Sequence, residues 1–443
     1  MSALNTDLYQ LTMAAGYFVT GKADEIATFE LLIRRLPPHR NFLIAAGLAQ
    51  AVEYLQTLAF RSNEIEYLRS LEQFQNVPAE FFDTLKELRF TGDLFALPEG
   101  TPVFANEPIA IVRAPLIQAQ LVETYLISTF TFQTAIASKA ARCVLASEGR
   151  PIVEFGSRRA HSPAAGVLAG RAAYLAGCSG TSNGEAGMRF GIPVFGTAAH
   201  SWTMAFPSEE ESFRCLQDLL GDATVFLLDT YDTIEGAHLA VRLGRPLWGV
   251  RLDSGDLVAL SRRVRQILDN AGLRDAKIFA TNDLNEYKVA SLLNAGAPFD
   301  AFGIGTQLAT SYDAPALSGV YKLVELERGG TLQYTAKFSD EKSTLPGAKQ
   351  IYRYPDRDVI ALYNECNSDF QGTPLVRPIL SRGELIEPLP PLERLRSGCQ
   401  ANIAALPKEL HSITESASYP VEISPRLLKL ADTLRNELQL VRS

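Results

Sequence analysis

The stretch LWGVRLDSGD at residues 247–256 decides how this chain folds. It begins as a short apolar strand over 247–252 and ends in charged and small residues. Ser254 can then cap a helix whose apolar positions form one stripe and which ends at Gly272. A strand followed at once by an amphipathic helix is the repeating unit of a parallel α/β fold. The segment therefore predicts one βα unit.

The same alternation extends from about residue 150 to 325. Helix-start signals lie between the strands, as in Ser162-Pro163, Ser208 with Glu211, and Asp283 with Glu286. The other apolar strand candidates are 152–155, 192–195, 224–229, 277–281, 299–304 and 319–325. Seven strands at this spacing favour an α/β barrel over an open sheet.

The two ends of the chain have a different pattern. Residues 1–120 combine charged helices with a proline-interrupted strand region, and residues 331–443 contain short strands, the proline-rich segment EPLPPLE and a final helix near 424–440. We therefore expect an α/β barrel catalytic domain over 121–330. A smaller companion α/β domain would be built from both ends.

Composition excludes several classes of protein. The 443 residues carry a formal charge of −8 and no basic run, which disfavours nucleic acid and anionic membranes as partners. The five cysteines have no CxxC or Cys/His spacing, so neither disulfides nor a zinc site is expected. The N-terminus does not resemble a signal peptide, and no uncharged stretch reaches the roughly 18 to 20 residues that cross a bilayer. We expect a cytoplasmic protein.

Polar residues follow the predicted strands at the edge where a barrel forms its active site. Acids, arginines, a histidine and glycines would meet there, and together they suit an anionic ligand that carries hydroxyl groups. The strand ends are Glu154 to Arg159, Gly196 to Ser201, Asp229 to Asp232, Arg251 to Asp256, Thr281 to Asp283, and Gly303 to Thr306.

Each of these groups also has a structural interpretation. Arg158 and Arg159 either contact a ligand or form a buried ion pair with Glu154, and Arg251 either binds a ligand or pairs with Asp253 across the strand end. Asp229 and Asp232 either contact a ligand or cap the next helix. Gly303 and Gly305 either approach a bound anion or form a tight turn.

His200 lies in a turn of small residues directly after a predicted strand. A lone histidine is often a satisfied core residue, but the small neighbours here leave the ring accessible, so a functional role stays open.

Several of these segments resemble one family, the nicotinate phosphoribosyltransferases. The resemblance rests on EFGSRR at 154–159, GCSGTSN at 177–183, FGTAAHSW at 195–202, LLDTYDT at 227–233, GVRLDSGDL at 249–257 and FGIGTQL at 302–308, with TDLYQLTMAAGYF and KFSDEKSTLPGAKQIYR nearer the ends. It implies an irregular α/β barrel of type II phosphoribosyltransferases beside a smaller domain, acting as a homodimer with shared sites. The implied reaction joins nicotinate to phosphoribosyl pyrophosphate, coupled to ATP hydrolysis with Mg²⁺.

The resemblance also implies roles for particular residues. His200 would be transiently phosphorylated by ATP, Asp253 would hold the ribose hydroxyls, and Arg251 and Arg158 would lie near the base and the 5′-phosphate. Phe155 and Tyr9 would sandwich the pyridine ring, with Tyr9 coming from the partner subunit. The other substrate-binding candidates are Thr181, Ser182, Asp229, Gly303, Gly305, Lys337 and Lys342, with Lys349 and Arg35 as further phosphate contacts.

Four other functions compete with this one. A nicotinamide-using relative has an aspartate at the position of Ser182, where a carboxylate would repel nicotinate, so Ser182 favours the acid. A quinolinate enzyme needs a denser basic cluster for its dicarboxylate. A non-catalytic sensor is expected to lose His200 or Asp253, and both are present here. A barrel aldolase or isomerase needs a lysine or glutamate at the centre of a strand end. Of the strand-end residues only Glu154 could serve, and the adjacent arginines would keep it ionised and occupied.

Overall fold

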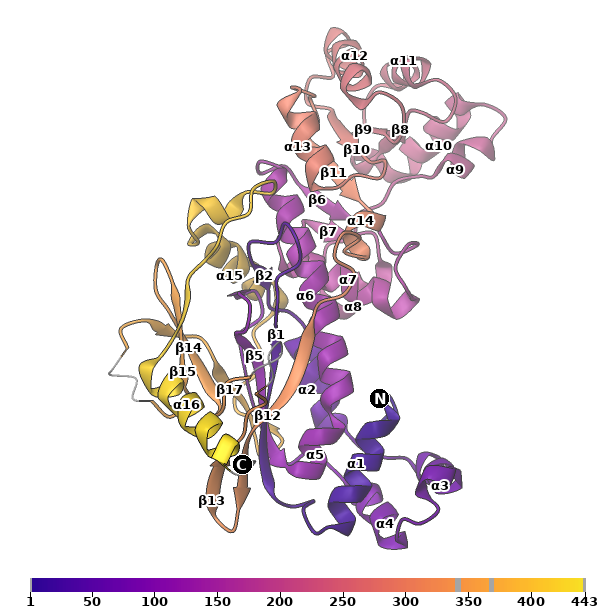
Figure 1. Cartoon of the computed structure of the whole chain (residues 1–443). Coiled ribbons are helices and arrows are strands. Elements are labelled where there is room, and N and C mark those ends of the chain that lie inside the picture. Colours follow the sequence, from indigo (N-terminus) through magenta and orange to yellow (C-terminus); the bar gives the residue numbers. More distant parts are fainter. Residues whose placement is uncertain (1, 339–343, 366–369, 441–443) are drawn as a thin grey trace. The chain divides into compact units, whose positions relative to one another are not determined.

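The computed structural model describes residues 2–338, 344–365 and 370–440. The chain divides into two compact units, Ala135–Pro315 and Met1–Thr134 with Ala316–Ser443. We call them the barrel unit and the companion unit (Figure 1). The sequence led us to place the boundaries at 120/121 and 330/331 and to expect the companion to be the smaller part. By this division the companion unit holds the larger share of the chain.

The barrel unit is built on six parallel strands in the order β7-β6-β11-β10-β9-β8. Helices connect them, which is the βα alternation that the sequence predicted (Figure 1). The strands are β6 (Ile152–Glu154), β7 (Gly180–Thr181), β8 (Val225–Leu227), β9 (Gly249–Leu252), β10 (Lys277–Ala280) and β11 (Ala301–Ile304). The helices are α7 (Pro163–Leu175), α8 (Gly184–Phe190), α9 (His200–Met204), α10 (Glu209–Leu220), α11 (Thr233–Leu243), α12 (Leu257–Asn270), α13 (Glu286–Asn294) and α14 (Thr306–Ala309).

The barrel is irregular where the segment after α8 crosses between its two edge strands. Val194 makes one parallel bridge with Thr181 of β7, and the Thr197 hydroxyl donates to the carbonyl of Val225 in β8 at 2.9 Å. The predicted strand 192–195 is therefore only a bridge. Pro193 has no N–H to donate, which prevents a regular ladder at this point.

The predicted strand 319–325 does not belong to the barrel. It forms β12 (Gly319–Arg328) of the companion unit and pairs antiparallel with β1 (Ile26–Ile33). Its burial alternates along part of its length, with half-exposed charged residues such as Lys322 and Glu327. Such alternation is typical of an antiparallel strand with one open face, whereas barrel strands are buried on both faces.

The companion unit contains a seven-stranded sheet in the order β13-β12-β1-β5-β3-β17-β18. Helices from the N-terminal part of the chain share a hydrophobic core with this sheet. Leu31, Phe81 and Val112 lie in that core and are fully buried. The remaining strands of this sheet are β3 (Asp93–Ala96), β5 (Pro108–Pro115), β13 (Thr331–Tyr334), β17 (Arg377–Ser381) and β18 (Glu384–Leu385). The helices are α1 (Leu8–Val19), α2 (Leu48–Thr57), α3 (Ser62–Ser70), α4 (Ala79–Glu87), α5 (Leu116–Leu121), α6 (Glu123–Ala146, which runs on into the barrel unit), α15 (Leu392–Ala404) and α16 (Pro425–Leu440).

Two smaller sheets complete the companion unit. One contains four strands in the order β16-β14-β15-β19, and the other pairs β2 with β4. The bounds are β2 (Leu43–Ile44), β4 (Pro102–Val103), β14 (Lys349–Arg353), β15 (Asp358–Leu362), β16 (Thr373–Pro374) and β19 (Val421–Ile423). The expected strand 350–354 and final helix 424–440 therefore correspond to β14 and α16.

The predicted helix starts are correct at two positions and displaced at two. Ser162 and Ser208 accept the capping hydrogen bonds from Ala165 N and Glu211 N. Asp256 caps α12 in place of Ser254, and Asn285 caps α13 in place of Asp283. The displaced residues belong to the strand-end loops described below.

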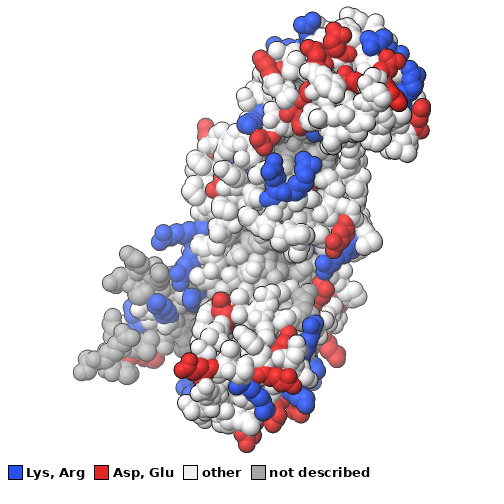
Figure 2. Space-filling view, turned by 90° about the vertical axis from the view of Figure 1, so that its right-hand side faces the viewer, with Lys and Arg blue, Asp and Glu red and all other residues white. Residues whose placement is uncertain are grey.

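Three expectations drawn from composition, on membrane spans, charge and cysteines, can be compared with the described residues. Within that part of the chain, no helix has both the length and the apolar character needed to cross a membrane. On the face in Figure 2, basic and acidic side chains are mixed in some regions, and small groups of basic side chains alone lie in others. Cys143, Cys178, Cys215 and Cys399 are free thiols, and Cys366 lies outside the described residues.

Candidate active site

The barrel brings the predicted strand ends together around a polar cavity of about 230 Å³. Its lining comes from β6, β9, β10, β11 and the loops that follow them, as expected for the carboxyl edge of an α/β barrel. The lining residues are Phe155, Arg158, Arg159, Arg251, Asp253, Thr281, Asn282, Asp283, Gly303, Gly305 and Thr306. We call this cavity the rim cavity.

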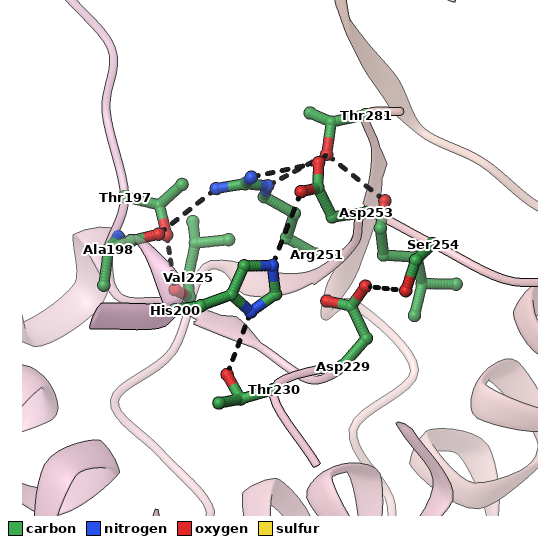
Figure 3. Close-up of polar contacts among 11 residues, drawn as sticks. Thr197, Ala198, His200, Val225, Asp229, Thr230, Arg251, Asp253, Ser254 and Thr281 are labelled. Carbon is green, nitrogen blue, oxygen red and sulfur yellow. Dashed lines mark hydrogen bonds and ion pairs between the residues drawn. The ribbon is translucent and has the colours of Figure 1, made fainter. Parts of the chain in front are cut away.

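Arg251 is fixed by three contacts within the barrel unit (Figure 3). Its Nε donates to Thr281 Oγ1 at 2.9 Å, one terminal nitrogen donates to the carbonyl of Ala198 at 3.2 Å, and the other lies 3.0 Å from Asp253 Oδ1. The pairing interpretation of Arg251 is therefore correct, and the ligand-binding interpretation stays open because the guanidinium also lines the rim cavity.

Asp253 stays ionised because of these neighbours. Partial burial acts to raise its pKa, but the Thr281 hydroxyl, which donates to Oδ1, and the charge of Arg251 outweigh that effect and lower the pKa below its usual range. An ionised carboxylate is an acceptor for hydroxyl groups. Asp253 is thus suited to hold a ribose.

His200 begins the short helix α9 and has oxygen atoms at both ring nitrogens (Figure 3). Nδ1 lies 3.2 Å from Thr230 Oγ1, and Nε2 lies 3.6 Å from Asp253 Oδ2. The side chain keeps 40% of its surface exposed, so the ring is positioned and remains reachable. This arrangement suits a nucleophile or proton carrier better than a packed core histidine.

Asp229 and Asp232 have different environments although they are three residues apart. Asp232 caps α11 by accepting from the N–H groups of Ile234 and Glu235. Asp229 accepts from the Ser254 hydroxyl through Oδ2, while its buried Oδ1 has no hydrogen-bond partner among the described residues. The helix-cap interpretation is therefore correct for Asp232 only, and Asp229 keeps an acceptor to offer a ligand.

Glu154 does not pair with the adjacent arginines. It is fully buried and accepts from the Thr181 hydroxyl at 2.6 Å and from Gly156 N–H, and burial raises its pKa despite these bonds. Arg158 and Arg159 are exposed, line the rim cavity and form no ion pair within the described chain. Both guanidinium groups are available to an anion.

Thr181 and Ser182 face different surroundings. The Thr181 side chain is fully buried and its hydroxyl is used by Glu154, so its structural role is to position β6 against β7. Ser182 is exposed, and its N–H donates to the carbonyl of Glu154 at 2.9 Å. Of the two, only the Ser182 hydroxyl faces outward.

Phe155 lies half-buried at the base of the rim cavity, edge-on to Phe279 with ring centroids 5.5 Å apart. Gly303 allows this packing, because a Cβ atom there would come within 2.8–2.9 Å of Thr281, Phe155 and Phe279. Gly305 lies close to the backbone of Phe155, where a Cβ would approach its carbonyl to 3.2 Å. Gly303 thus lets β11 approach the aromatic rings, and Gly305 lets the following turn approach the backbone of Phe155.

The remaining predicted site residues belong to the companion unit or lie outside the described chain. Tyr9 is 48% exposed and its hydroxyl donates to Glu123, while Lys337 is exposed. Lys342 lies outside the described residues. The Lys349 ammonium is buried and lies 2.5 Å from Glu30 Oε2, and its role as a phosphate contact stays a prediction.

Sequence reasoning missed the two threonines that orient the catalytic candidates. Thr230 contacts His200, and Thr281 contacts both Arg251 and Asp253. Both were visible as strand-end residues, but a hydroxyl carries no charge to mark it as functional. Asn282 and Asp283 also line the cavity with φ of 96° and 40°, a left-handed backbone state that is uncommon for residues other than glycine, Asn and Asp.

Comparisons with known proteins show the family of the chain. Three segments match family descriptions: the nicotinate phosphoribosyltransferase N-terminal domain at residues 4–131, the nicotinate phosphoribosyltransferase family at 151–338, and the nicotinate phosphoribosyltransferase C-terminal domain at 363–431. Relatives include nicotinate phosphoribosyltransferase pncB2 of Mycobacterium tuberculosis, 44% identical over 98% of this chain and 94% of that protein. The nicotinate phosphoribosyltransferase of Bacillus subtilis is 39% identical over 95% and 93%.

Solved structures give the same result. Human nicotinic acid phosphoribosyltransferase is similar at a TM-score of 0.84 with 29% identity, covering 97% of this chain and 99% of that one. A nicotinate-nucleotide pyrophosphorylase from Pyrococcus furiosus shares the fold at a TM-score of 0.74 and 22% identity, over 91% of this chain and 95% of that one. The sequence similarity over nearly the whole length, together with the fold and the rim of strand ends, shows that this chain belongs to the nicotinate phosphoribosyltransferase family.

Proposed function

We propose that the rim cavity joins nicotinate to the phosphoribosyl group of phosphoribosyl pyrophosphate, in salvage of pyridine nucleotides, and that ATP hydrolysis at His200 drives the reaction. Displacement at the anomeric carbon passes through an oxocarbenium-like state. The enzyme therefore mainly holds the two reactants in line and stabilises charge. The observation that carries the proposal is the position of His200, with oxygen atoms at both ring nitrogens and its ring open to solvent.

The other rim residues bind substrate in this proposal. The Asp253 carboxylate accepts from the ribose hydroxyls, and its partner Arg251 lies near the base and phosphate. The exposed guanidinium of Arg158 binds the 5′-phosphate, and Gly303 and Gly305 let backbone N–H groups approach it. Phe155 provides one face of the pyridine site, and Tyr9 of a partner subunit provides the other. Ser182 admits the carboxylate of nicotinate.

His200 accepts the γ-phosphoryl group of ATP in this scheme. A ring nitrogen forms the new bond to phosphorus as the bond to the bridging oxygen breaks, and ADP leaves. Later hydrolysis of the phosphohistidine releases phosphate. The phosphorylated ring would change the electrostatics of the site beside Asp253 and the phosphoribosyl donor, and so link the two reactions.

The residues present could hold Mg²⁺ only together with substrate phosphates, and not in a site built from protein ligands alone. Among the described residues, no group of three or more acids, histidines or cysteines is arranged to enclose a metal. Mg²⁺ commonly uses one or two carboxylates together with substrate phosphates. Asp229 fits that role, because its buried Oδ1 has no protein partner. The ion would neutralise phosphate charge there.

A product-resolved assay tests this function. Purified protein is supplied with phosphoribosyl pyrophosphate and Mg²⁺, and with nicotinate, nicotinamide or quinolinate separately, each with and without ATP. We expect nicotinate mononucleotide as the main product, and stimulation by ATP that is lost in His200→Ala. Turnover of nicotinamide in its place would overturn the role given to Ser182, and no product from any base would favour a non-catalytic sensor.

A homodimer with shared sites is the second part of the proposal, since Tyr9 acts in it across the subunit boundary. Mixing His200→Ala, which lacks the ATP-stimulated activity, with Tyr9→Ala, which lacks one face of the pyridine site, tests it by the return of ATP-stimulated activity. In a dimer with shared sites, hybrid dimers regain one intact site, so activity returns toward a quarter of wild type at most. Mixtures that stay inactive, in a protein that sediments as a monomer, would contradict the shared site.

A further inference from the structure

Glu154 is a buried acid that the proposed reaction does not use. It ends β6, is fully buried and forms no ion pair within the described chain. A buried carboxyl group without a cation lowers the stability of a fold, whereas an apolar side chain of similar size does not. Both carboxyl oxygens nevertheless accept hydrogen bonds, so this acid does more than fill the core.

The Glu154 side chain joins two strand-end loops. Its Oε1 accepts from Gly156 N–H in the loop after β6, and its Oε2 accepts from the Thr181 hydroxyl at the end of β7, at 2.6 Å. The backbone carbonyl of Glu154 also accepts from Ser182 N–H at 2.9 Å. One residue therefore holds the loop after β6 and the loop after β7 together.

Asn183 adds a second connection between the same two loops. Its Nδ2 donates to Ser157 Oγ at 3.1 Å, and its backbone N–H donates to the Thr181 hydroxyl oxygen at 3.1 Å. Because the Thr181 oxygen accepts from Asn183, its own proton is left to donate to Glu154. The loops are thus linked at two points, and Glu154 is the buried one.

The loop after β6 has a further attachment of its own. Phe155 N–H donates to the carbonyl of Ile304 in β11 at 2.8 Å. At the next residue, Gly156, an added Cβ would overlap the Cβ of Ala309. This loop is therefore closely packed against the β11 side of the barrel. Loss of the Glu154 carboxyl contacts should accordingly displace the loop after β7 more than the loop after β6.

We propose that Glu154 is a positioning residue that sets the fit of the pyridine substrate. Its bond to Thr181 holds Ser182 at a fixed distance from Phe155, and this spacing admits a flat ring that carries a carboxylate. The inference rests on the proposed function, which gives the ring to Phe155 and the carboxylate to Ser182. It adds that the choice of base depends on a buried residue behind the two that contact it.

Steady-state kinetics of the full chain test this role. Thr181→Val removes the hydroxyl bond to Glu154 and keeps the shape of the side chain, Thr181→Ser keeps the hydroxyl, and Glu154→Leu removes both carboxyl contacts. Thr224→Val is the matched control. Thr224 is also a fully buried threonine of the barrel unit, and its hydroxyl donates to the Gly221 carbonyl at 2.6 Å, but it lies before β8, at the opposite end of a strand. KM and kcat are measured for nicotinate, nicotinamide and phosphoribosyl pyrophosphate, with the melting temperature of each protein.

We expect Thr181→Val and Glu154→Leu to raise the KM for nicotinate about tenfold, the equivalent of one hydrogen bond to a charged group, and to leave the KM for phosphoribosyl pyrophosphate unchanged. The preference for nicotinate over nicotinamide should fall with it, and Thr181→Ser should restore both. Thr224→Val should lower the melting temperature and leave every KM unchanged. Equal rises in the KM of both substrates, or an unchanged KM for nicotinate in Thr181→Val, would overturn the positioning role.

Phe155→Ala separates this inference from the proposed function. If Phe155→Ala raises the KM for nicotinate and Thr181→Val does not, the pyridine site stands and the role of Glu154 is wrong. If neither variant changes that KM, or the unaltered protein turns over no base, the proposed function fails and the positioning role fails with it. Should Glu154→Leu not fold, Thr181→Val and its serine counterpart still decide the outcome.

Discussion

The hydroxyl oxygen of Thr230 lies 3.2 Å from Nδ1 of His200. Thr230 follows β8 and His200 begins α9, so two strand-end loops meet at this contact (Figure 3). With Asp253 facing Nε2, the ring is oriented from both sides. A ring oriented in this way loses less entropy when it meets a phosphoryl group, which makes Thr230 a positioning residue.

The first prediction concerns that contact. Thr230→Val keeps the shape of the side chain and removes the hydroxyl, so ATP-dependent formation of phosphohistidine should slow about 3- to 10-fold, the equivalent of one neutral hydrogen bond. Thr230→Ser should restore it. Rapid-quench labelling with γ-³²P-ATP measures the rate. Thr233→Val, three residues away on α11 and without a hydroxyl contact to any described residue, is the control and should leave the rate unchanged.

A second prediction concerns Asp253 and pH. Its pKa is lowered in the folded protein, so its ionised form stabilises the fold above the ordinary carboxyl pKa of about 3.9, and that stability is lost as the pH falls through the lowered pKa. The difference in unfolding free energy between the protein with Asp253 and its Asp253→Asn variant should thus be constant from pH 8 to 5 and shrink below about pH 4. Urea unfolding measures it, in a His200→Gln background so that the imidazole does not titrate. A difference that already varies between pH 5 and 8 would contradict the lowered pKa.

The third prediction concerns Gly303. In Gly303→Ala the new methyl group meets Thr281, Phe155 and Phe279 at 2.8–2.9 Å, so the Phe155 ring must move out of its place in the rim cavity. The KM for nicotinate should rise about tenfold, the cost of a misplaced aromatic contact. Steady-state kinetics measure this. Gly184→Ala, where nothing lies within 4 Å of the added Cβ, should leave KM unchanged.

A fourth prediction separates binding from stability at Arg158. This side chain is exposed and has no ion pair among the described residues, so Arg158→Ala should leave the melting temperature unchanged. If Arg158 binds the 5′-phosphate, kcat/KM for phosphoribosyl pyrophosphate should fall about 10- to 100-fold, since charge-assisted bonds are worth roughly 1.5–3 kcal/mol. Arg214→Ala, which loses only the surface pair with Glu210, is the control. An unchanged kcat/KM would remove Arg158 from the site.

Much of the barrel could be predicted because its signals are local. A buried parallel strand followed by a capped helix is marked within about twenty residues, and the strand-end loop of Arg251 to Asp256 was placed at the correct edge. The same locality explains the error at 319–325. An apolar run in the sequence does not indicate which strand it will pair with. Only the pairing with β1 shows that β12 belongs to the companion unit.

The site was predictable in its charges and less so in its contacts. Arg251, Asp253 and His200 stand out by type and position, but the sequence could not tell that Glu154 takes its hydrogen bonds from Thr181 and Gly156. Nor could it separate lysines within one segment. Lys337 lies in the loop after β13 and is exposed, whereas Lys349 begins β14 and is buried against Glu30 of β1.

The last prediction follows from that difference. Lys349→Met leaves Glu30 buried without its cation, which should lower the free energy of unfolding by about 3–5 kcal/mol. The double change Glu30→Leu with Lys349→Met removes both charges and should recover most of that loss. Arg328→Met, which breaks the exposed pair with Glu25, should cost less than about 1 kcal/mol. Urea unfolding compares the four proteins. If Lys349→Met were as mild as Arg328→Met while activity collapsed, Lys349 would act on substrate and its burial against Glu30 would not describe the protein in solution.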